Sequence, residues 1–301
     1  MNTLKKSLLW FLAFVVTAGA AYYQRKTGPT YPKSVSVTLN DSVYKLKLVR
    51  SIGLDERSEV KLNVKDTSVK TVLYYKRFKT QDKYQSANFS YKVYPVHSFV
   101  MNRIFRITEE EGLFADVPQQ PPAGKLQYYI ELTDLNGTRV IMKDTPVVVR
   151  FKDSVPGYIL APHIIIMFIA MLFSTVTGLM SIFNVPEYKK YGIWTLILLI
   201  AGGIILGPIV QKLAFGEFWT GVPFGWDLTD NKTLIAFIFW ALAVIMNLKK
   251  RRPFYMVLAA IVLLLVYSLP HSLFGSELDY NTGQVTQGII FTFIMEYQKN
   301  I

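Results

Sequence analysis

The chain has 301 residues, 51% of them apolar, with a formal net charge of +12 and no cysteine. The lack of cysteine excludes disulfides, thiolate metal sites and a cysteine nucleophile. The positive charge does not indicate a nucleic-acid-binding protein, because the basic residues cluster between long apolar runs, as they do in membrane proteins with basic cytoplasmic loops. We therefore expect membrane lipid, and no nucleic acid, as a partner of this protein.

Long apolar runs at the start of the chain and after Pro156 predict membrane-spanning helices. A helix needs about 20 mainly apolar residues to cross a bilayer, and about 17 is the lower limit. Residues 1–24 form either an uncleaved membrane anchor or a signal segment, since small residues follow the apolar run. Residues 157–271 then form a four-helix transmembrane domain. The predicted α-helical membrane bundle has about five spans, at residues 7–23, 158–183, 193–214, 233–248 and 253–270.

The basic clusters predict the orientation of these spans. The clusters are residues 5–6, 189–190 and 249–252. Under the positive-inside rule all three lie in the cytoplasm, so the N-terminus is inside. The segment 25–156, the loop before the fourth span and the tail 272–301 are then outside. This arrangement is expected for a protein of the bacterial cytoplasmic membrane.

The segment 25–156 has the pattern of an all-β domain. Short runs rich in Val, Tyr, Thr and Leu, such as "SVSVTLN", "VKTVLYYKRF" and "TPVVVRF", alternate with turn residues. This spacing predicts an antiparallel sandwich outside the cytoplasm. The segment has no nucleophile-elbow, Walker or zinc-protease motif, and we expect His97 to be an ordinary surface histidine. A binding module is therefore the expected role.

One stretch of this segment resembles a known class of module. Residues 112–137, "GLFADVPQQPPAGKLQYYIELTDLNG", are similar to the late strands of fibronectin-III or immunoglobulin-like modules of bacterial exported proteins. The resemblance covers about residues 30–150 and implies an immunoglobulin-like periplasmic sandwich inserted after the first span. Such modules host many functions, so the implied partners are other membrane or extracytoplasmic proteins of unspecified kind.

Two of the three histidines lie at the predicted outer ends of spans. His163 follows "ILAP" near the start of the second span, and His271 follows "YSLP" at the end of the fifth. Polar groups within spans are costly and are often functional. The two histidines are therefore either ligands of a bound group or hydrogen-bond partners of backbone carbonyls that the neighbouring prolines expose.

The loop "FWTGVPFGWDLTDNK" at residues 218–232 falls on the same side. Its aromatic residues are either interfacial anchors or the walls of a pocket, and we predict that Trp219 and Trp226 line a pocket. Asp227 or Asp230 is predicted to cap the N-terminus of the next helix. The glycines allow tight turns and a close approach of the backbone to a flat ligand.

This loop resembles a loose form of the tryptophan-rich "WGxxWxWD" signature of haem-handling proteins of cytochrome c maturation. The "WGxxW" core of that signature is absent from this chain. In that family, histidines at the outer ends of helices ligate haem beside the loop, so the resemblance implies haem b as the cofactor. Carried over by position, it assigns His163 and His271 as axial ligands, and Trp219, Gly221, Trp226 and Asp227 to the loop signature.

A bound copper or zinc ion is the alternative to haem, and a protein without any cofactor is the third interpretation. A metal ion would take His163 and His271 as its ligands, because imidazoles and carboxylates suit an open copper or zinc site. The carboxylates available to complete such a site are Asp227 and either Glu277 or Asp279.

Three classes of function stay open. The first is a membrane protein with a haem or metal in a redox or cofactor-handling role. The second is a non-catalytic subunit whose sandwich recruits partners to a membrane complex. The third is an enzyme that acts on an exported or lipid-linked substrate. Its acid–base groups would be Asp227, Asp230, Glu277 and the two histidines.

Overall fold

The computed structural model describes residues 3–97, 99–270 and 275–286. The chain divides into two compact units. The helical unit contains Met1–Pro29, Ser154–Glu277 and Thr286–Ile301, and the strand unit contains Thr30–Asp153 and Leu278–Val285. The chain thus combines a helical unit with a separate β-sheet unit, as the sequence predicts.

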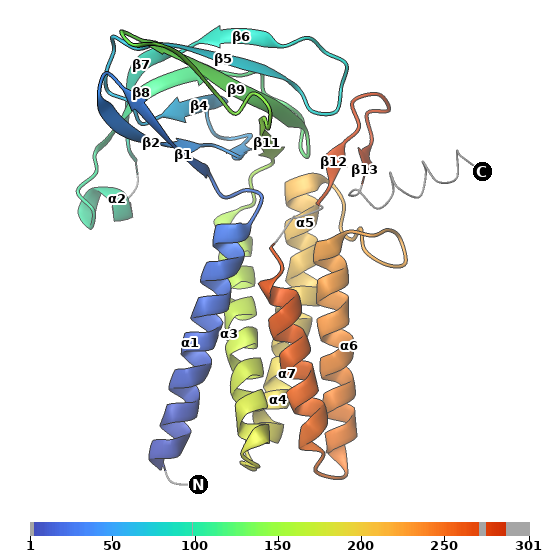
Figure 1. Ribbon diagram of the computed structural model, residues 1–301. Helices are drawn as coiled ribbons and strands as arrows, with labels where there is room; N and C mark the ends of the chain where they lie inside the picture. Colours follow the sequence, from blue (N-terminus) through green and yellow to red (C-terminus); the bar gives the residue numbers. More distant parts are fainter. Residues whose placement is uncertain (1–2, 98, 271–274, 287–301) are drawn as a thin grey trace. The chain divides into compact units, whose positions relative to one another are not determined.

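The helical unit is built from helices that lie side by side (Figure 1). Among the described residues, four helices are long and apolar enough to cross a membrane: α1, α3, the continuous helix Tyr188–Phe215, and α6. The fifth predicted span is α7, which has only 16 residues; at about 1.5 Å per residue it is about 24 Å long, shorter than a hydrocarbon core of roughly 30 Å. The helices are α1 (Thr3–Thr27), α3 (Gly157–Ile182), α4 (Tyr188–Leu198), η1 (Leu199–Leu206), α5 (Gly207–Phe215), α6 (Leu228–Leu248) and α7 (Pro253–Ser268).

Local sequence signals set the ends of these helices. Asp227 is the N-cap of α6, so the helix begins five residues earlier than the predicted span at 233, and the prediction of Asp227 as a cap is confirmed. Gly216 ends α5 in the left-handed conformation that glycine adopts at no steric cost (φ 94°). Pro253 opens α7 at a position where its missing N–H is harmless.

The interior of the helical unit depends on small residues that let helices approach. A Cβ atom added at Gly178 of α3 would lie 2.7 Å from the Cβ of Ala260 in α7, and one added at Gly192 of α4 would lie 2.8 Å from the sulfur of Met256. These distances are shorter than van der Waals contact. Glycine at helix contacts is typical of membrane bundles, in which backbones pack closely.

The strand unit contains three sheets that share one core. The strands are antiparallel, except that β3 and β11 run parallel. The largest sheet has the order β3 (Ser51–Gly53), β11 (Val147–Lys152), β9 (Lys125–Asp134), β5 (Lys70–Arg77), β6 (Gln85–Asn88), with β10 (Gly137–Ile141) also on β9. The second has the order β4 (Glu59–Leu62), β8 (Glu109–Asp116), β7 (Ser90–Pro95), and the third pairs β1 (Lys33–Leu39) with β2 (Ser42–Leu48).

The core of this unit follows from the alternation of apolar residues along the strands. Side chains of successive strand residues point to opposite faces, so apolar residues two apart enter the same core. All three sheets contribute fully buried side chains, among them Leu46, Leu62, Leu73, Ile130 and Phe151.

The C-terminal segment returns to the strand unit. Its short strands β12 (Glu277–Leu278) and β13 (Val285–Thr286) form a hairpin. The hydroxyl of Tyr280 accepts a hydrogen bond from the backbone N–H of Lys125 and donates one to its carbonyl, both at 2.9 Å. Part of the predicted tail 272–301 therefore belongs to the same compact unit as the β-domain.

We predict that one carboxylate gives the strand unit a pH-dependent stability. Asp134 accepts hydrogen bonds from the backbone N–H groups of Asn40 and Asn136, each at 2.9 Å, and from Arg139 at 2.7 Å. These bonds, that of Asn40 first, hold the pKa of Asp134 below its ordinary value. A pKa that is lower in the folded state contributes stability above the unfolded pKa of about 4, and this is lost as pH falls through the folded pKa.

Asp134→Asn should therefore lower the unfolding temperature of the strand unit at pH 7. The gap between parent and variant should shrink as the pH falls below about 4. Thermal unfolding of the full-length chain in detergent, followed by circular dichroism of the strands, measures both effects. A gap of constant size over this pH range would contradict the prediction.

Candidate functional site

Three charged side chains are buried together at one end of the helical unit. Asp227, Asp230 and Lys232 lie at the start of α6, and each is at most 5% exposed. Charged groups in a membrane-spanning helix are costly and are usually paired with polar partners. The same end of the unit contains the preceding loop, residues 216–227, which we call the aromatic loop.

Both carboxylates are engaged with backbone N–H groups. Asp227 accepts from the N–H of Thr229 at 2.7 Å and of Asp230 at 3.3 Å. Asp230 accepts from the N–H of Thr220 at 2.6 Å and from its hydroxyl at 3.2 Å, which fastens the aromatic loop to the first turn of α6. Gln211 of α5 donates to the same hydroxyl at 2.6 Å. Both acids are therefore used in hydrogen bonds that hold the loop and the helix. To act as acid–base catalysts, they would have to break these bonds.

Gly221 lets the aromatic loop lie directly on α6. A Cβ atom at this position would be 2.7 Å from the Cβ of Asp230 and 2.8 Å from the Oδ1 of Asn231, so no larger residue fits without a shift. The same Oδ1 accepts a hydrogen bond from the N–H of Val222 at 2.8 Å. The role of Gly221 that the structure describes is thus close packing of the loop against a helix.

The aromatic side chains of the loop differ in their surroundings. The indole N–H of Trp219 donates to the carbonyl of Val222 at 3.1 Å, and the ring is half-buried. Trp226 is 53% exposed and Phe224 is 80% exposed. Phe218 lies under the ammonium of Lys212, whose nitrogen is 5.5 Å from the ring centroid. The loop is therefore a fixed structure that presents aromatic rings outward.

His163 is held near the start of α3. It lies about 9 Å along α3 at 1.5 Å per residue, and its Nδ1 is 2.9 Å from the carbonyl oxygen of Gly202 in η1. A carbonyl oxygen only accepts hydrogen bonds, so the hydrogen resides on Nδ1 and the Nε2 atom keeps a lone pair. Gly207 is next to the ring: a Cβ atom there would be 3.9 Å from Cε1.

The glycines of η1 make this hydrogen bond possible. A Cβ atom at Gly202 would be 2.8 Å from the Cγ2 of Ile166, and one at Gly203 would be 2.8 Å from the Cγ2 of Thr233. Their absence allows η1 to approach α3 and α6 closely. The run "AGG" was the sequence signal for this contact, but the widened π-helical turn that contains it has no sequence signature of its own.

The second predicted ligand, His271, lies outside the described residues, so its pairing with His163 stays a prediction. Asp279 accepts the N–H of Asn281 at 2.8 Å in the turn of the C-terminal hairpin. Glu277 precedes that turn and is half-buried. Within residues 3–97, 99–270 and 275–286, no group of three His, Asp or Glu side chains is arranged to hold a metal ion.

Lys232 is a buried group whose role the sequence did not reveal. Its ammonium donates to the carbonyls of Leu269 at 2.8 Å and Pro270 at 3.4 Å, just beyond the C-terminus of α7. Gln24 of α1 donates to the carbonyl of Tyr267 in the same helix at 2.6 Å. Gln24 therefore satisfies one of the last carbonyls of α7, which no intrahelical N–H reaches, and Lys232 satisfies the two carbonyls that follow the helix.

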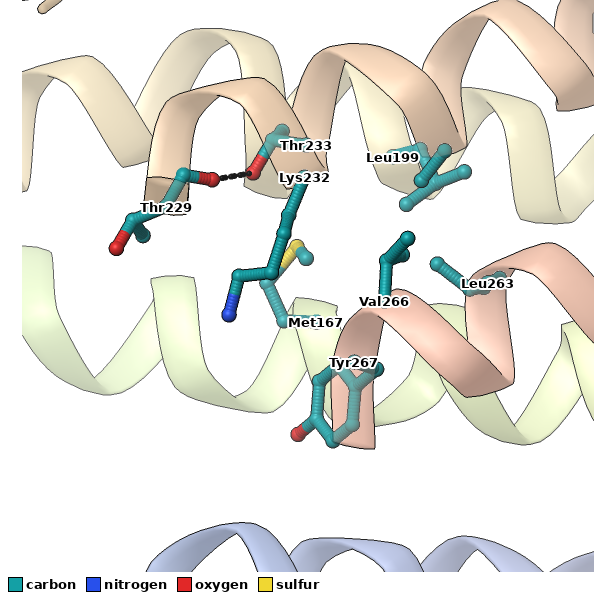
Figure 2. A pocket seen from close by; sticks show the side chains of 9 residues that line it. Met167, Leu199, Thr229, Lys232, Thr233, Leu263, Val266 and Tyr267 are labelled. Atoms are coloured by element: carbon teal, nitrogen blue, oxygen red, sulfur yellow. Dashed lines mark hydrogen bonds between the residues drawn. The ribbon is translucent and has the colours of Figure 1, made fainter. Parts of the chain in front are cut away.

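A small cavity lies beside Lys232 (Figure 2). It measures about 30 Å³, which is enough for one water molecule and far too small for a haem. The hydroxyl of Thr233, one of the lining residues, is already engaged, because it donates to the carbonyl of Thr229 at 3.0 Å. The cavity is lined by Met167, Leu199, Thr229, Lys232, Thr233, Ala236, Leu263, Val266 and Tyr267, and by neither Trp219 nor Trp226.

We expect Gly221→Ala to loosen the aromatic loop. The added methyl group overlaps Asp230 and Asn231, and overpacking of this kind costs about 1–3 kcal/mol. The unfolding temperature should fall, and protease cleavage within residues 216–227 should become faster. Gly19→Ala in α1 is the matched control, because a Cβ atom there meets nothing within 4 Å. Equal effects of the two changes would contradict the described packing.

Comparison with known proteins gives no relative for this chain: no protein-family model, curated protein or solved structure matches it. Its function is therefore inferred from its own residues and contacts.

Proposed function

We propose that this protein is a membrane protein that binds haem at the end of the helical unit where α3 begins, in a redox or cofactor-handling role. The observation that carries the proposal is the hydrogen bond between Nδ1 of His163 and the carbonyl of Gly202. Metal-ligating histidines almost always donate one ring N–H to a carbonyl or carboxylate, which leaves the other nitrogen to bind the metal. His163 has this arrangement, with Nε2 as the ligating atom.

The composition of the site favours haem over a free copper or zinc ion. A zinc or copper site takes three or four ligands from the protein, and the described residues contain no such group. A haem brings four nitrogens of its own, so the protein supplies one or two axial ligands. His163 is sufficient as one of them, and His271 is the proposed second.

The acid–base enzyme is the least supported of the three classes. Its candidate acids, Asp227 and Asp230, are buried and accept hydrogen bonds from backbone N–H groups. A general acid or base must reach the proton of a substrate, and a buried carboxylate with these partners has to break them first.

A partner-recruiting subunit is the second candidate, and the aromatic loop is the observation that favours it. Three of its aromatic side chains are more than half exposed, namely Phe218, Phe224 and Trp226. The base of the loop is fixed by Asp230 and Asn231. Rigid, exposed aromatic residues are the usual centres of protein interfaces. This function needs no chromophore, so an absorption spectrum separates the two candidates.

We also propose that the strand unit is an immunoglobulin-like module. In such modules the third, sixth and seventh strands form one sheet, and the first, second, fourth and fifth strands form a second sheet that packs over it. The order β11-β9-β5-β6 beside β4-β8-β7, with the early strand β3 running parallel to β11, supports this assignment. Such a module would serve either candidate function, because the fold does not specify the activity.

The proposed orientation places the strand unit outside the cytoplasm of a bacterial cell. Lys6 at the start of α1 pairs with Glu187 at the start of α4, so two of the three basic clusters lie at one end of the helical unit. The third cluster follows α6, which runs antiparallel to the helix before it. A common end for all three supports the cytoplasmic location that the positive-inside rule assigns to them.

We expect a cysteine at position 136 to be accessible from outside the cell. Asn136→Cys lies in the turn between β9 and β10, and the parent chain has no other cysteine. A membrane-impermeant maleimide should label this variant in intact spheroplasts, and Lys249→Cys, in a basic cluster, only after lysis. Labelling in the reverse order would overturn the orientation.

The haem proposal predicts a visible-range haem spectrum that depends on His163. The full-length protein, expressed with haem available and purified in detergent, should show this spectrum, and His163→Ala should lose or shift it. His163→Gln keeps a hydrogen-bond donor for Gly202 and should also lose the spectrum, although its folded yield stays near that of the parent. His97→Ala, in the strand unit, is the control and should change nothing.

A parent protein that carries no haem under these conditions excludes the haem proposal. Elemental analysis for copper and zinc on the same sample then tests the alternative cofactors. If the protein carries neither haem nor metal, the partner-recruiting subunit becomes the preferred function.

A further inference from the structure

One loop of the strand unit exposes a group of large apolar side chains. It lies between β7 and β8 and contains the short helix α2 (Phe99–Arg103). Four of its apolar side chains are exposed, with exposed fractions from 43% to 66%. Exposed apolar residues gathered in one place mark a binding surface far more often than single ones do. We call residues 101–107 the apolar finger; its exposed apolar members are Met101, Ile104, Phe105 and Ile107.

The backbone of the finger is closed on itself. The N–H of Ile107 donates to the carbonyl of Met101 at 2.9 Å, and at the neck of the loop the N–H of Val96 donates to the carbonyl of Thr108 at 2.8 Å. Arg106 has a left-handed conformation (φ 56°) that turns the chain back. The exposed side chains therefore project from a defined turn rather than from an extended strand.

The charged residues of the finger are all basic. Its sequence, "MNRIFRI", contains Arg103 and Arg106 and no acidic residue. The acidic residues that follow have other partners: Glu110 pairs with Lys61 at 2.8 Å, and Glu111 pairs with Lys65. Apolar side chains next to arginines are typical of segments that lie in the headgroup layer of an anionic membrane.

The connections of the strand unit keep it at a membrane. Between the end of α1 and the start of β1 lie only residues 28–32, and between the end of β11 and the start of α3 only residues 153–156. At about 3.5 Å per residue, each connection reaches less than about 20 Å. Both neighbouring helices are long and apolar enough to cross a membrane. A surface on the strand unit is therefore at high effective concentration relative to lipid, so even weak affinity suffices for binding.

We propose that the apolar finger binds the lipid surface of the membrane to which the strand unit is tethered. Ile104 and Phe105, the most exposed members, enter the headgroup layer, while Arg103 and Arg106 contact lipid phosphates. This contact restrains the orientation of the strand unit above the membrane. The proposal uses no residue of the haem site and holds whichever side of the membrane the strand unit occupies.

Site-specific fluorescence in bilayers tests this contact. Ile104→Cys and Leu135→Cys, each labelled with the fluorophore NBD, are reconstituted as full-length chains into nanodiscs of phosphatidylcholine and phosphatidylglycerol. The chain has no cysteine of its own, so each label is unique. Leu135 is the control because it is 91% exposed, on the turn between β9 and β10. The label at 104 should be blue-shifted and quenched by nitroxide-labelled lipid, and the label at 135 should remain in water.

Two further variants separate the apolar from the electrostatic contribution. In the Ile104→Cys chain, Phe105→Ser with Ile107→Ser should bring lipid quenching down to the level of the control site. Arg103→Gln with Arg106→Gln should remove any additional quenching that phosphatidylglycerol gives over pure phosphatidylcholine. Folding of each variant is checked by its circular dichroism spectrum.

Equal lipid quenching at 104 and 135 in a folded chain overturns the proposal. So does a label at 104 that is shielded from aqueous iodide and yet not quenched by lipid, since this result indicates a contact with protein, such as a second copy of the chain. The spectrum of the haem proposal is independent of both outcomes, because its residues lie in the helical unit.

Discussion

The backbone groups at the ends of membrane helices determine where the helical unit carries its buried charges. A bilayer provides no water for the first N–H and last C=O groups of a helix, so side chains must satisfy them. Asp227 and Asp230 lie at the N-terminus of α6, and Lys232 donates to carbonyls just beyond the C-terminus of α7. The two acids match the positive end of the α6 dipole, and the ammonium of Lys232 lies at the negative end of α7. Three costly charges thus stabilise two helix ends and one loop.

This distribution of charge narrows the choice of chemistry. Asp227 and Asp230, the candidate catalytic acids, hold the aromatic loop on α6 through Thr220 and the first turn of the helix. Removing either would disturb the loop before it affected a reaction. The imidazole of His163 is different, since its single described bond orients the ring and leaves a ligating nitrogen. The proposed ligand role of His163 therefore requires no rearrangement of these hydrogen bonds, whereas an acid–base role of Asp227 and Asp230 does.

The sequence predicted the features of this protein that arise from neighbouring residues. Apolar runs predicted five spans, of which four are helices long and apolar enough to cross a membrane and the fifth is the shorter α7. Strand alternation predicted the β-domain, and Asp227 was identified as a cap because capping acts within three residues. The predictions were incomplete where partners are distant in the chain. From the sequence, Lys232 is only a polar residue at the start of a span. The structure shows that it binds the carbonyls of Leu269 and Pro270, which are distant in the chain. From the sequence, Tyr280 belongs to the C-terminal tail. In the structure its hydroxyl hydrogen-bonds the backbone of Lys125, 155 residues away in the chain.

The π-helical turn η1 links the glycine-rich sequence to the proposed ligand. In η1 the carbonyl of Gly202 accepts the N–H of Gly207, five residues on, where an α-helix would use the N–H four residues on. The same oxygen accepts the Nδ1–H of His163, so both of its lone pairs are used. A side chain at position 202 would overlap Ile166, push η1 away from α3 and separate the oxygen from the imidazole. Gly202 and His163 therefore act as a pair: the glycine brings the carbonyl within reach, and the carbonyl fixes which ring nitrogen is free to bind.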